Sequence, residues 1–158
     1  MSVETAFAIA NTGILPAWLL LALAPRWRVT ETLVHGGWYI AGYCLLYTGF
    51  LVYALGFTPP MEGASFNSLA GVMVLFSSPL GVLIGWVHYL AFDLFAGAWL
   101  ARDARRRGIA HWLVLPCLFF TLMFGPFGLL LYLAIRAYKT RSGPALQETA
   151  ASPAAVRP

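Results

Sequence analysis

Residues 79–107 read PLGVLIGWVHYLAFDLFAGAWLARDARRR. The part from 79 to 101 contains no lysine or arginine, and at ~1.5 Å per helical residue it is long enough to cross a ~30 Å hydrocarbon core. Pro79 suits the first turn of a helix, and the arginine-rich end suits a membrane surface. This stretch therefore predicts a transmembrane helix that carries two ionisable side chains, His88 and Asp93, near its centre.

The composition of the whole chain indicates the same solvent. Hydrophobic residues make up 60% of the 158 residues and charged residues 10%, whereas soluble domains have roughly 45–50% apolar and about 25% charged residues. A soluble protein of this size would have too few polar residues to cover its core. No cleavable signal pattern precedes the first apolar run, so we expect this run to be retained as a span.

Other apolar segments predict the remaining spans. Pro16 predicts a kink within the first of them. The fold class is an all-α, polytopic transmembrane helix bundle of about four spans in one domain, 1–139, and the polar and small residues after it predict a disordered tail, 140–158. The predicted spans are 5–24, 32–55, 79–101 and 109–138, with a short interfacial or re-entrant helix at 68–78.

The distribution of basic residues predicts the orientation of the spans. Loops 25–31 and 102–108 contain arginines, whereas the loop between the second and third spans contains no lysine or arginine. We therefore expect the two basic loops on the cytoplasmic side.

Segment 109–138 is too long for one upright helix and is interrupted at Gly125-Pro126. Two alternatives stay open there, a kink in a tilted helix or a hairpin turn that returns the basic residues after it to the cytoplasmic side.

Several classes of function lack their sequence signatures. The 10 Lys and Arg residues form short clusters beside apolar runs, whereas nucleic-acid binding needs a continuous basic face. The chain has no phosphate-binding glycine loop, no nucleophile elbow, no haem-attachment cysteine pair and no metal-ligand spacing. We therefore expect no nucleic-acid partner, no metal and no cofactor. Cys44 and Cys117 lie in apolar runs and are expected to be small core residues.

His88 and Asp93 are the residues best suited to carry chemistry. An ionisable side chain at the bilayer centre costs about 2.5–3.5 kcal/mol on insertion scales, so it usually has both a partner and a function. Asp93 shares a helix face with Trp86 and Tyr89, whereas His88 lies roughly 140° around the helix. The two side chains cannot both point at one small ligand from an unbroken helix, but they could flank an elongated one.

A purely structural role is the alternative for the ionisable residues of this segment. Asp103, at the membrane surface, is expected to form helical ion pairs with Arg106 or Arg107, which follow it at spacings of three and four residues. For the acid within the third span, the structural alternative is a hydrogen bond to a polar side chain of a neighbouring span, namely Tyr43, Tyr47 or Asn11.

A wider set of residues resembles one known family. Together the matching pieces extend from residue 11 to residue 136, and the piece at 85–97 is the most specific. On these residues the chain resembles the abscisic-acid-deficient-4-like membrane family, whose plant members are needed for neoxanthin synthesis in plastids. The pieces are Asn11…Leu15-Pro16-x-Trp18-x-Leu20, Pro25-x-Trp27-x-x-Thr30, Gly85-Trp86-Val87-His88-Tyr89-Leu90-x-Phe92-Asp93-Leu94-Phe95-x-Gly97, Asp103, and Pro116-Cys117-Leu118…Thr121…Gly125-Pro126-x-Gly128-Leu129.

The resemblance implies a four-helix-type integral membrane protein. The plant members are implicated in converting the epoxy-carotenoid violaxanthin to neoxanthin, so the activity implied here is the isomerisation of a carotenoid or another isoprenoid lipid. Opening an epoxide to an allene is an isomerisation, so it needs an acid and a base and no redox cofactor. A carboxyl group removed from water favours its protonated form and can donate its proton. The implied roles are acid for Asp93 and base for His88. The implied binding residues for a carotenoid or another isoprenoid lipid are Asn11, Trp86, Tyr89, Phe92 and Thr121.

Two further classes of function fit the same sequence. One is a non-catalytic carotenoid-binding or lipid-binding protein, or a membrane assembly factor. The other is a small transporter or assembly subunit in which Asp93 relays protons.

The chain shows no plastid presequence pattern and begins close to its first span, as a bacterial member would. We therefore expect the bacterial inner membrane, surrounding membrane lipid, and assembly as a homo-oligomer or with a partner enzyme.

Overall fold

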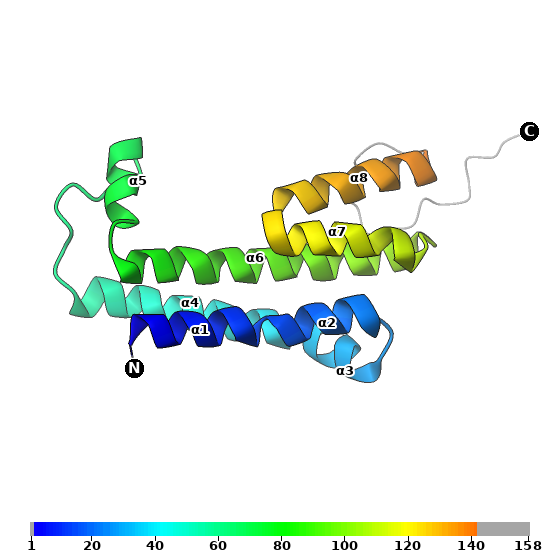
Figure 1. The fold of residues 1–158 in the computed structure, drawn as a ribbon, viewed down its shortest axis with the longest axis horizontal. Helices are drawn as coiled ribbons and strands as arrows, with labels where there is room; N and C mark the ends of the chain where they lie inside the picture. Colours follow the sequence, from blue (N-terminus) through cyan, green and yellow to red (C-terminus); the bar gives the residue numbers. More distant parts are fainter. Residues whose placement is uncertain (1, 142–158) are drawn as a thin grey trace, which may run out of the picture.

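The computed structural model describes residues 2–141, and all regular secondary structure in that range is helical (Figure 1). A shorter apolar helix accompanies three long ones. The all-α transmembrane fold class is confirmed, and the chain is an integral membrane protein. The predicted tail, 140–158, lies outside the described residues except for Thr140 and Arg141. The three segments that are long and apolar enough to cross a membrane are Val3–Leu23, Arg28–Phe57 and Pro79–Arg106.

The first span is kinked where proline interrupts it. Helix α1 (Val3–Gly13) is separated by one residue from helix α2 (Leu15–Leu23), whose first turn contains Pro16. Proline has no N–H to donate to the preceding turn, so carbonyl groups near the break need other partners. The Tyr39 hydroxyl donates to the Gly13 carbonyl oxygen at 2.6 Å. This bond ties the kink to the second span.

The second span begins with an irregular turn. Helix α3 (Arg28–Thr30) continues into the π-helix η1 (Glu31–His35), and helix α4 (Trp38–Phe57) follows. Gly37 separates η1 from α4 with a φ of 84°, a left-handed conformation that glycine adopts with little strain. Figure 1 shows this turn at the same end of the molecule as the C-terminal ends of α2 and α8.

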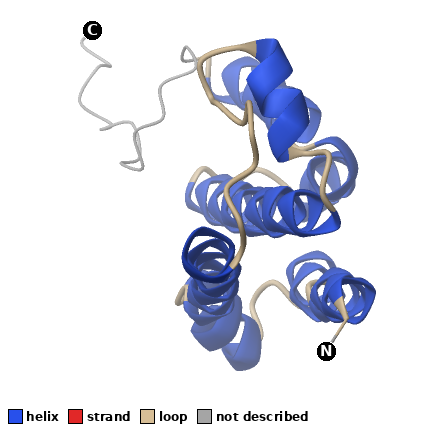
Figure 2. Cartoon of the chain, turned by 90° about the vertical axis from the view of Figure 1, so that its left-hand side faces the viewer, coloured by secondary structure: helices blue, strands red, loops and turns tan. Residues whose placement is uncertain are grey.

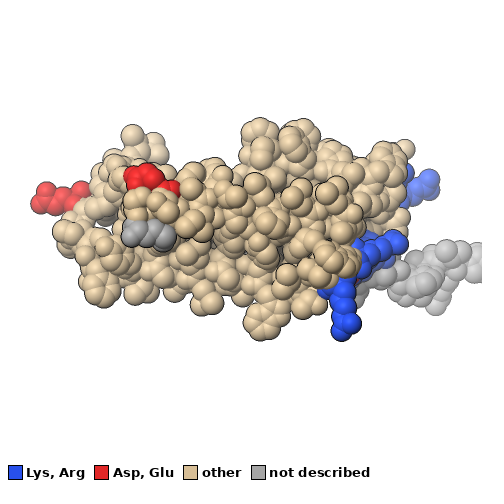
Figure 3. Space-filling view, turned by 60° about the horizontal axis from the view of Figure 1, so that its bottom comes forward, with Lys and Arg blue, Asp and Glu red and all other residues tan. Residues whose placement is uncertain are grey.

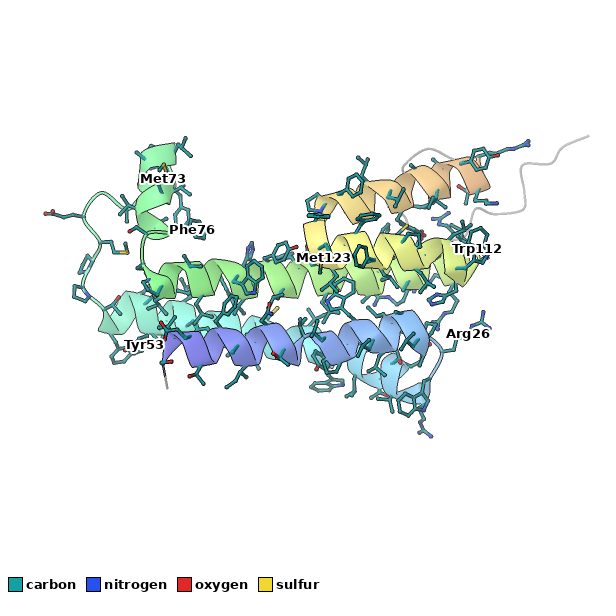
Figure 4. All side chains as sticks on the ribbon, in the orientation of Figure 1. Arg26, Tyr53, Met73, Phe76, Trp112 and Met123 are labelled. Carbon is teal, nitrogen blue, oxygen red and sulfur yellow. The ribbon has the colours of Figure 1, made fainter. Side chains whose placement is uncertain are left out.

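A short helix stands at the opposite end of the molecule. Helix α5 (Leu69–Leu75) stands out sideways from the start of helix α6 (Pro79–Arg106) in Figure 1. Its 7 residues reach about 10 Å, which is too short to cross a bilayer. Phe76, labelled in Figure 4, packs its ring against Gly85 of α6. Helix α5 occupies the place where the sequence predicts a short interfacial or re-entrant helix.

The segment predicted as the fourth span, 109–138, folds as two helices instead of one span. Helices α7 (His111–Phe124) and α8 (Pro126–Thr140) run antiparallel and pack along each other (Figure 1). Gly125 forms the turn with a φ of 47° and a ψ of −96°, a conformation that a residue with a side chain adopts only under strain. Pro126 cannot continue the hydrogen bonds of α7 because it has no N–H. Of the two alternatives at this point, the structure has the hairpin.

The dimensions and the charges of the hairpin are those expected of a re-entrant segment. The 14 residues of α7 and 15 of α8 reach about 20–23 Å each, less than the ~30 Å of a hydrocarbon core. On the face drawn in Figure 3, the visible Lys and Arg side chains lie at one end and the visible Asp and Glu side chains at the other, with an uncharged surface between them. Lys139, in the last turn of α8, returns to the end that holds loops 25–31 and 102–108. Both ends of the hairpin therefore lie at the basic end.

Helix α6 is the centre of the bundle, which Figure 2 shows end-on. It packs against α1, α2, α4, α7 and α8. Small residues allow these neighbours to approach closely. At Gly97 an added Cβ would come within 2.7 Å of the Trp18 indole of α2. Because α6 touches every long element, its polar side chains meet several helices at once.

Candidate functional site in the centre of helix α6

The turn of the hairpin closes over Asp93. This side chain lies midway along α6, its residue is 8% exposed, and a Cβ added at Gly125 would lie 2.6 Å from its Oδ1 atom. Glycine is therefore required at the turn by the contact as well as by its φ. Within residues 2–141, the buried Oδ2 atom of Asp93 has no hydrogen-bond partner of normal geometry. A buried carboxyl oxygen usually has a hydrogen-bond partner, so Asp93 is the first candidate for a site where a ligand or a water completes the bonding.

A groove opens beside this carboxyl, between α6 and the hairpin. Its volume is about 560 Å³. Phe92, which is 60% exposed, and Phe95 flank it on the side that faces the bilayer. The groove is an apolar site with an acid at its floor, which is the usual character of a small-molecule site. Its lining residues are Phe92, Asp93, Phe95, Ala96, Trp99, Gly125, Pro126 and Leu129.

Three of the predicted binding residues, Asn11 of α1 and Trp86 and Tyr89 of α6, are half-buried and do not line the groove. The indole N–H of Trp86 donates to the Asn11 side-chain oxygen at 3.1 Å, and the indole lies 5.3 Å from the Tyr89 ring. The Tyr89 hydroxyl donates to the Leu122 carbonyl oxygen at 3.3 Å and lies beside the Asp93 carboxyl. Trp86 and Asn11 thus join α6 to α1, and Tyr89 links the region of the acid to the hairpin.

His88 points to a different face of α6. It is exposed, and its ring lies 5.6 Å from the Tyr47 ring and 4.7 Å from the Phe92 ring. It does not line the groove, in agreement with the roughly 140° that separates positions 88 and 93 on an ideal helix. The structure therefore does not bring His88 and Asp93 together as an acid and a base.

Thr121 is engaged within the hairpin. Its side chain is fully buried, and its hydroxyl donates to the Cys117 carbonyl oxygen at 2.7 Å. Gly128 of α8 lies directly against it, so a side chain at Gly128 would collide with Thr121. This threonine lies at the close contact between α7 and α8, and it does not line the groove.

The partners expected for Asp93 in a structural role are used elsewhere. The Tyr43 hydroxyl donates to the Ala10 carbonyl oxygen at 2.6 Å. Asn11 accepts from the indole of α6, and Tyr47 packs on an imidazole. Among the described residues, none of these three side chains supplies the missing partner of Oδ2.

A second carboxylate, Asp103, is buried although the sequence predicts it at the membrane surface. It is 1% exposed because α8 covers it. The Tyr132 hydroxyl donates to it at 2.6 Å, and it pairs with Arg107 at 2.9 Å and with Arg136 at 3.2 Å. The pair with Arg107 is the helical ion pair that the sequence predicts. The two partners from α8 are distant in sequence and come together only through the hairpin.

This cluster fixes the hairpin to α6 and reaches the groove. The Arg136 guanidinium lies 5.8 Å from the centre of the Trp99 ring, and Trp99 also packs edge-on against Tyr132. Trp99 is at the same time a wall of the groove beside Asp93. The signal that could have found the cluster is a lone arginine, Arg136, within an apolar run and four residues after a tyrosine.

Comparisons with known proteins agree with this architecture. The family model described as ABA DEFICIENT 4-like matches residues 5–132. A curated relative, the chloroplastic protein ABA DEFICIENT 4 of Arabidopsis thaliana, is 29% identical over 108 residues, which cover 63% of this chain and 47% of the relative. The chain thus spans about half the length of the curated relative that it matches. No solved structure matches the chain.

Proposed function

This chain belongs to the ABA DEFICIENT 4-like family, and on that premise we propose that it binds a carotenoid or another isoprenoid lipid beside Asp93 and isomerises it by proton transfer. The observation that carries the proposal is Asp93 itself, whose residue lines an apolar groove and whose buried Oδ2 atom has no hydrogen-bond partner of normal geometry among the described residues. A soluble substrate would need a water-filled entrance. A groove that faces the bilayer instead suits a molecule already dissolved in lipid.

The shape of the groove supports a polyene ligand. Phe92, Phe95 and Trp99 present aromatic rings along it, and such rings pack well against a flat conjugated chain. The hairpin turn closes one side at Gly125 and Pro126. A ligand that packs along this wall would bring one of its polar groups to Asp93.

The proposed reaction needs a proton donor and a proton acceptor. For an epoxide substrate, protonated Asp93 donates its proton to the epoxide oxygen while the ring C–O bond breaks. A carbon of the adjacent polyene loses its proton while the new double bond forms. The product keeps the first proton as a hydroxyl group, so the substrate is neither oxidised nor reduced. We assign the second transfer to the Asp93 carboxylate left by the first, because His88 lies on another face of α6.

A non-catalytic binding protein is the second candidate. Among the residues that line the groove, Asp93 is the one with a titratable side chain, so no other lining residue can act as a separate base. This observation favours a binding protein. In this case the carboxyl group would hold a hydroxyl or epoxide oxygen of the ligand by a hydrogen bond. The ligand would leave the protein unchanged.

The proposed setting is the bacterial inner membrane, with the basic end of the molecule in the cytoplasm. The support is that loops 25–31 and 102–108 lie at the same end as the last turn of α8, which is the arrangement that the positive-inside rule favours. We propose that the protein acts there as a homo-oligomer or together with a partner enzyme.

Pigment analysis tests the proposed reaction. The full chain is expressed in bacteria that make epoxy-carotenoids, and the carotenoids are separated by chromatography. We expect an isomerised product with the wild type, no product with Asp93→Asn, and normal product with His88→Ala. Glu62→Gln makes the same acid-to-amide change in an exposed loop and is the matched control.

The outcomes separate the candidates. Unchanged turnover in a folded Asp93→Asn variant removes the proposed reaction. Loss of turnover in His88→Ala contradicts the assignment of both transfers to Asp93. A pigment that copurifies with the wild type in unchanged form, and is lost from Asp93→Asn, supports the non-catalytic binding protein instead.

A further inference from the structure

A cavity at the basic end of the molecule has no part in the proposed function. Its volume is about 180 Å³, and it lies where the loop after α2, η1, α6 and the start of α7 meet. Val114 forms part of its buried floor, whereas Arg26 and Ala110 are exposed at its rim. Arg105 on its wall is about 18 Å from Asp93 along the axis of α6. The cavity is therefore separate from the groove.

Arginine side chains make this cavity electropositive. Arg105 is paired with Glu31, so the charges of these two side chains offset each other. Arg26 forms no ion pair with any residue in the described part of the chain, and its positive charge is not balanced there. At His35 on the cavity wall, Arg102 and Arg105 act electrostatically in one direction and the nearby Glu31 in the other. Figure 4 places Arg26 at the same end of the molecule as Trp112.

His35 adds an imidazole ring to the wall of the cavity. Its Nδ1 atom is buried and has no partner of normal geometry between residues 2 and 141, although the backbone of Pro25 lies near the ring. The other histidine of the cavity, His111, is engaged, because its Nε2 atom lies 2.8 Å from the Ala22 carbonyl oxygen. His35 thus brings to the cavity wall a ring whose hydrogen bonding is incomplete among the described residues.

The start of α7 lies on the same wall. This helix has 14 residues, and its N-cap residue Ala110 has no side chain that could cap it. The first N–H groups of such a helix lack internal acceptors, and the helix dipole favours negative charge near them. Ala110 and His111 both line the cavity, so these donors border it.

From these features together we infer that the cavity binds the phosphate group of an anionic ligand. The oxygens of a phosphate accept hydrogen bonds from an arginine, an imidazole and helix N–H groups in one small volume. The cavity has about one third of the volume of the groove, so it suits a compact head group and not an isoprenoid chain. Its position at the basic end is the level at which phospholipid head groups lie. The phosphate can therefore belong to an anionic phospholipid or to a small phosphate compound from the aqueous side.

Binding to the purified full chain tests this inference. The chain is placed in nanodiscs of phosphatidylcholine, with or without phosphatidylglycerol, and inorganic phosphate or pyrophosphate is titrated in a separate series. Thermal unfolding and phosphorus NMR line widths report saturable binding. We expect about tenfold weaker binding in Arg26→Gln and in His35→Gln. Arg28→Gln removes the same charge from the same loop without touching the cavity lining and should bind as the wild type does.

The possible outcomes identify the source of the phosphate or overturn the inference. Stabilisation by phosphatidylglycerol alone assigns the site to a lipid head group, and stabilisation by phosphate or pyrophosphate in phosphatidylcholine assigns it to a soluble compound. Equal weakening in Arg26→Gln and Arg28→Gln would show a diffuse surface charge and overturn the inference. Lack of saturable binding for every probe would overturn it too. Because the readout is binding and not pigment turnover, failure here is distinguishable from failure of the proposed function.

Discussion

Asp93 and Asp103 lie on the same helix, about 15 Å apart along its axis, and both are more than nine-tenths buried. The Asp103 carboxylate is met by Tyr132, Arg107 and Arg136. The Asp93 carboxyl has an oxygen without a hydrogen-bond partner among the described residues and borders an apolar groove. The same residue type is thus fully partnered at one depth of the helix and incompletely partnered at another.

Under the proposed function, this difference separates a carboxylate that stabilises the fold from one that is available for chemistry. Asp103 joins α6 to α8 and so fixes the end of the hairpin. With that end fixed, Gly125 at the tip is held against Asp93. The stabilising cluster and the candidate site therefore depend on each other, but removing their carboxyl groups should have different consequences.

The largest expected effect on stability is that of Asp103→Asn. Removing the carboxylate leaves Arg136 buried without the anion that faces it, and breaking a buried pair in this way costs about 3–5 kcal/mol. Thermal unfolding of the purified chain in detergent measures the loss. Glu62→Gln, the same change on an exposed loop, should leave the unfolding temperature unchanged. A loss below about 1 kcal/mol in Asp103→Asn would remove the distinction between the two carboxyl groups.

A smaller loss is expected for Gly125→Ala. Alanine is strained at this φ, by about 1–3 kcal/mol, and its Cβ would also press on the Asp93 carboxyl. Gly108→Ala is the matched control, because Gly108 has a φ of 65° and an added Cβ there meets nothing within 4 Å. The control should lose only the backbone part, about 1 kcal/mol.

The contact with the acid can be isolated by a second change. We expect Gly125→Ala to lose more unfolding free energy than Gly108→Ala does. Adding Asp93→Ala to Gly125→Ala removes the contact between the new Cβ and the carboxyl group and should restore that difference. If the double variant recovers nothing, the turn does not rest on Asp93.

Asp93→Asn is expected to change stability by less than about 1 kcal/mol in either direction. The side chain keeps its size, and the oxygen that is replaced has no hydrogen bond to lose within the described residues. Chemical or thermal unfolding compares it directly with Asp103→Asn. A destabilisation as large as that of Asp103→Asn would assign Asp93 a structural role.

Cysteine labelling should show that the hairpin begins and ends on one side of the membrane, without any effect on stability. In a background lacking Cys44 and Cys117, single cysteines replace Arg28, Lys139 or Glu62. We expect the first two to react with a membrane-impermeant reagent from the cytoplasmic side and Glu62→Cys to react from the other side. Reaction of Lys139→Cys on the side of Glu62→Cys would mean that the hairpin crosses the membrane.

The sequence predicts well what depends on neighbours along the chain. The kink at Pro16 follows from a missing N–H, and the long apolar runs follow from the thickness of the bilayer. The depth of Asp93 follows from its place within residues 79–101. The separation of His88 from Asp93 follows from the 3.6-residue period of a helix.

What the sequence does not predict depends on contacts between distant segments. The choice between kink and hairpin at Gly125 is made by packing of α8 on α7 and α6, which local patterns do not contain. The burial of Asp103 follows from that choice, because Tyr132 and Arg136 arrive with α8. The inward positions of Trp86 and Asn11 likewise result from the packing of α1 against α6.

The most direct test of the central claim is to label the native chain in lipid with a hydrophobic carbodiimide, which reacts with carboxyl groups reachable from the bilayer, and to locate the adduct by mass spectrometry. We predict modification of Asp93, because its carboxyl group borders a membrane-facing groove with an unpartnered oxygen. We predict none at Asp103, whose partners enclose it. An adduct on Asp103 with Asp93 unmodified, or equal labelling of both, would contradict the account.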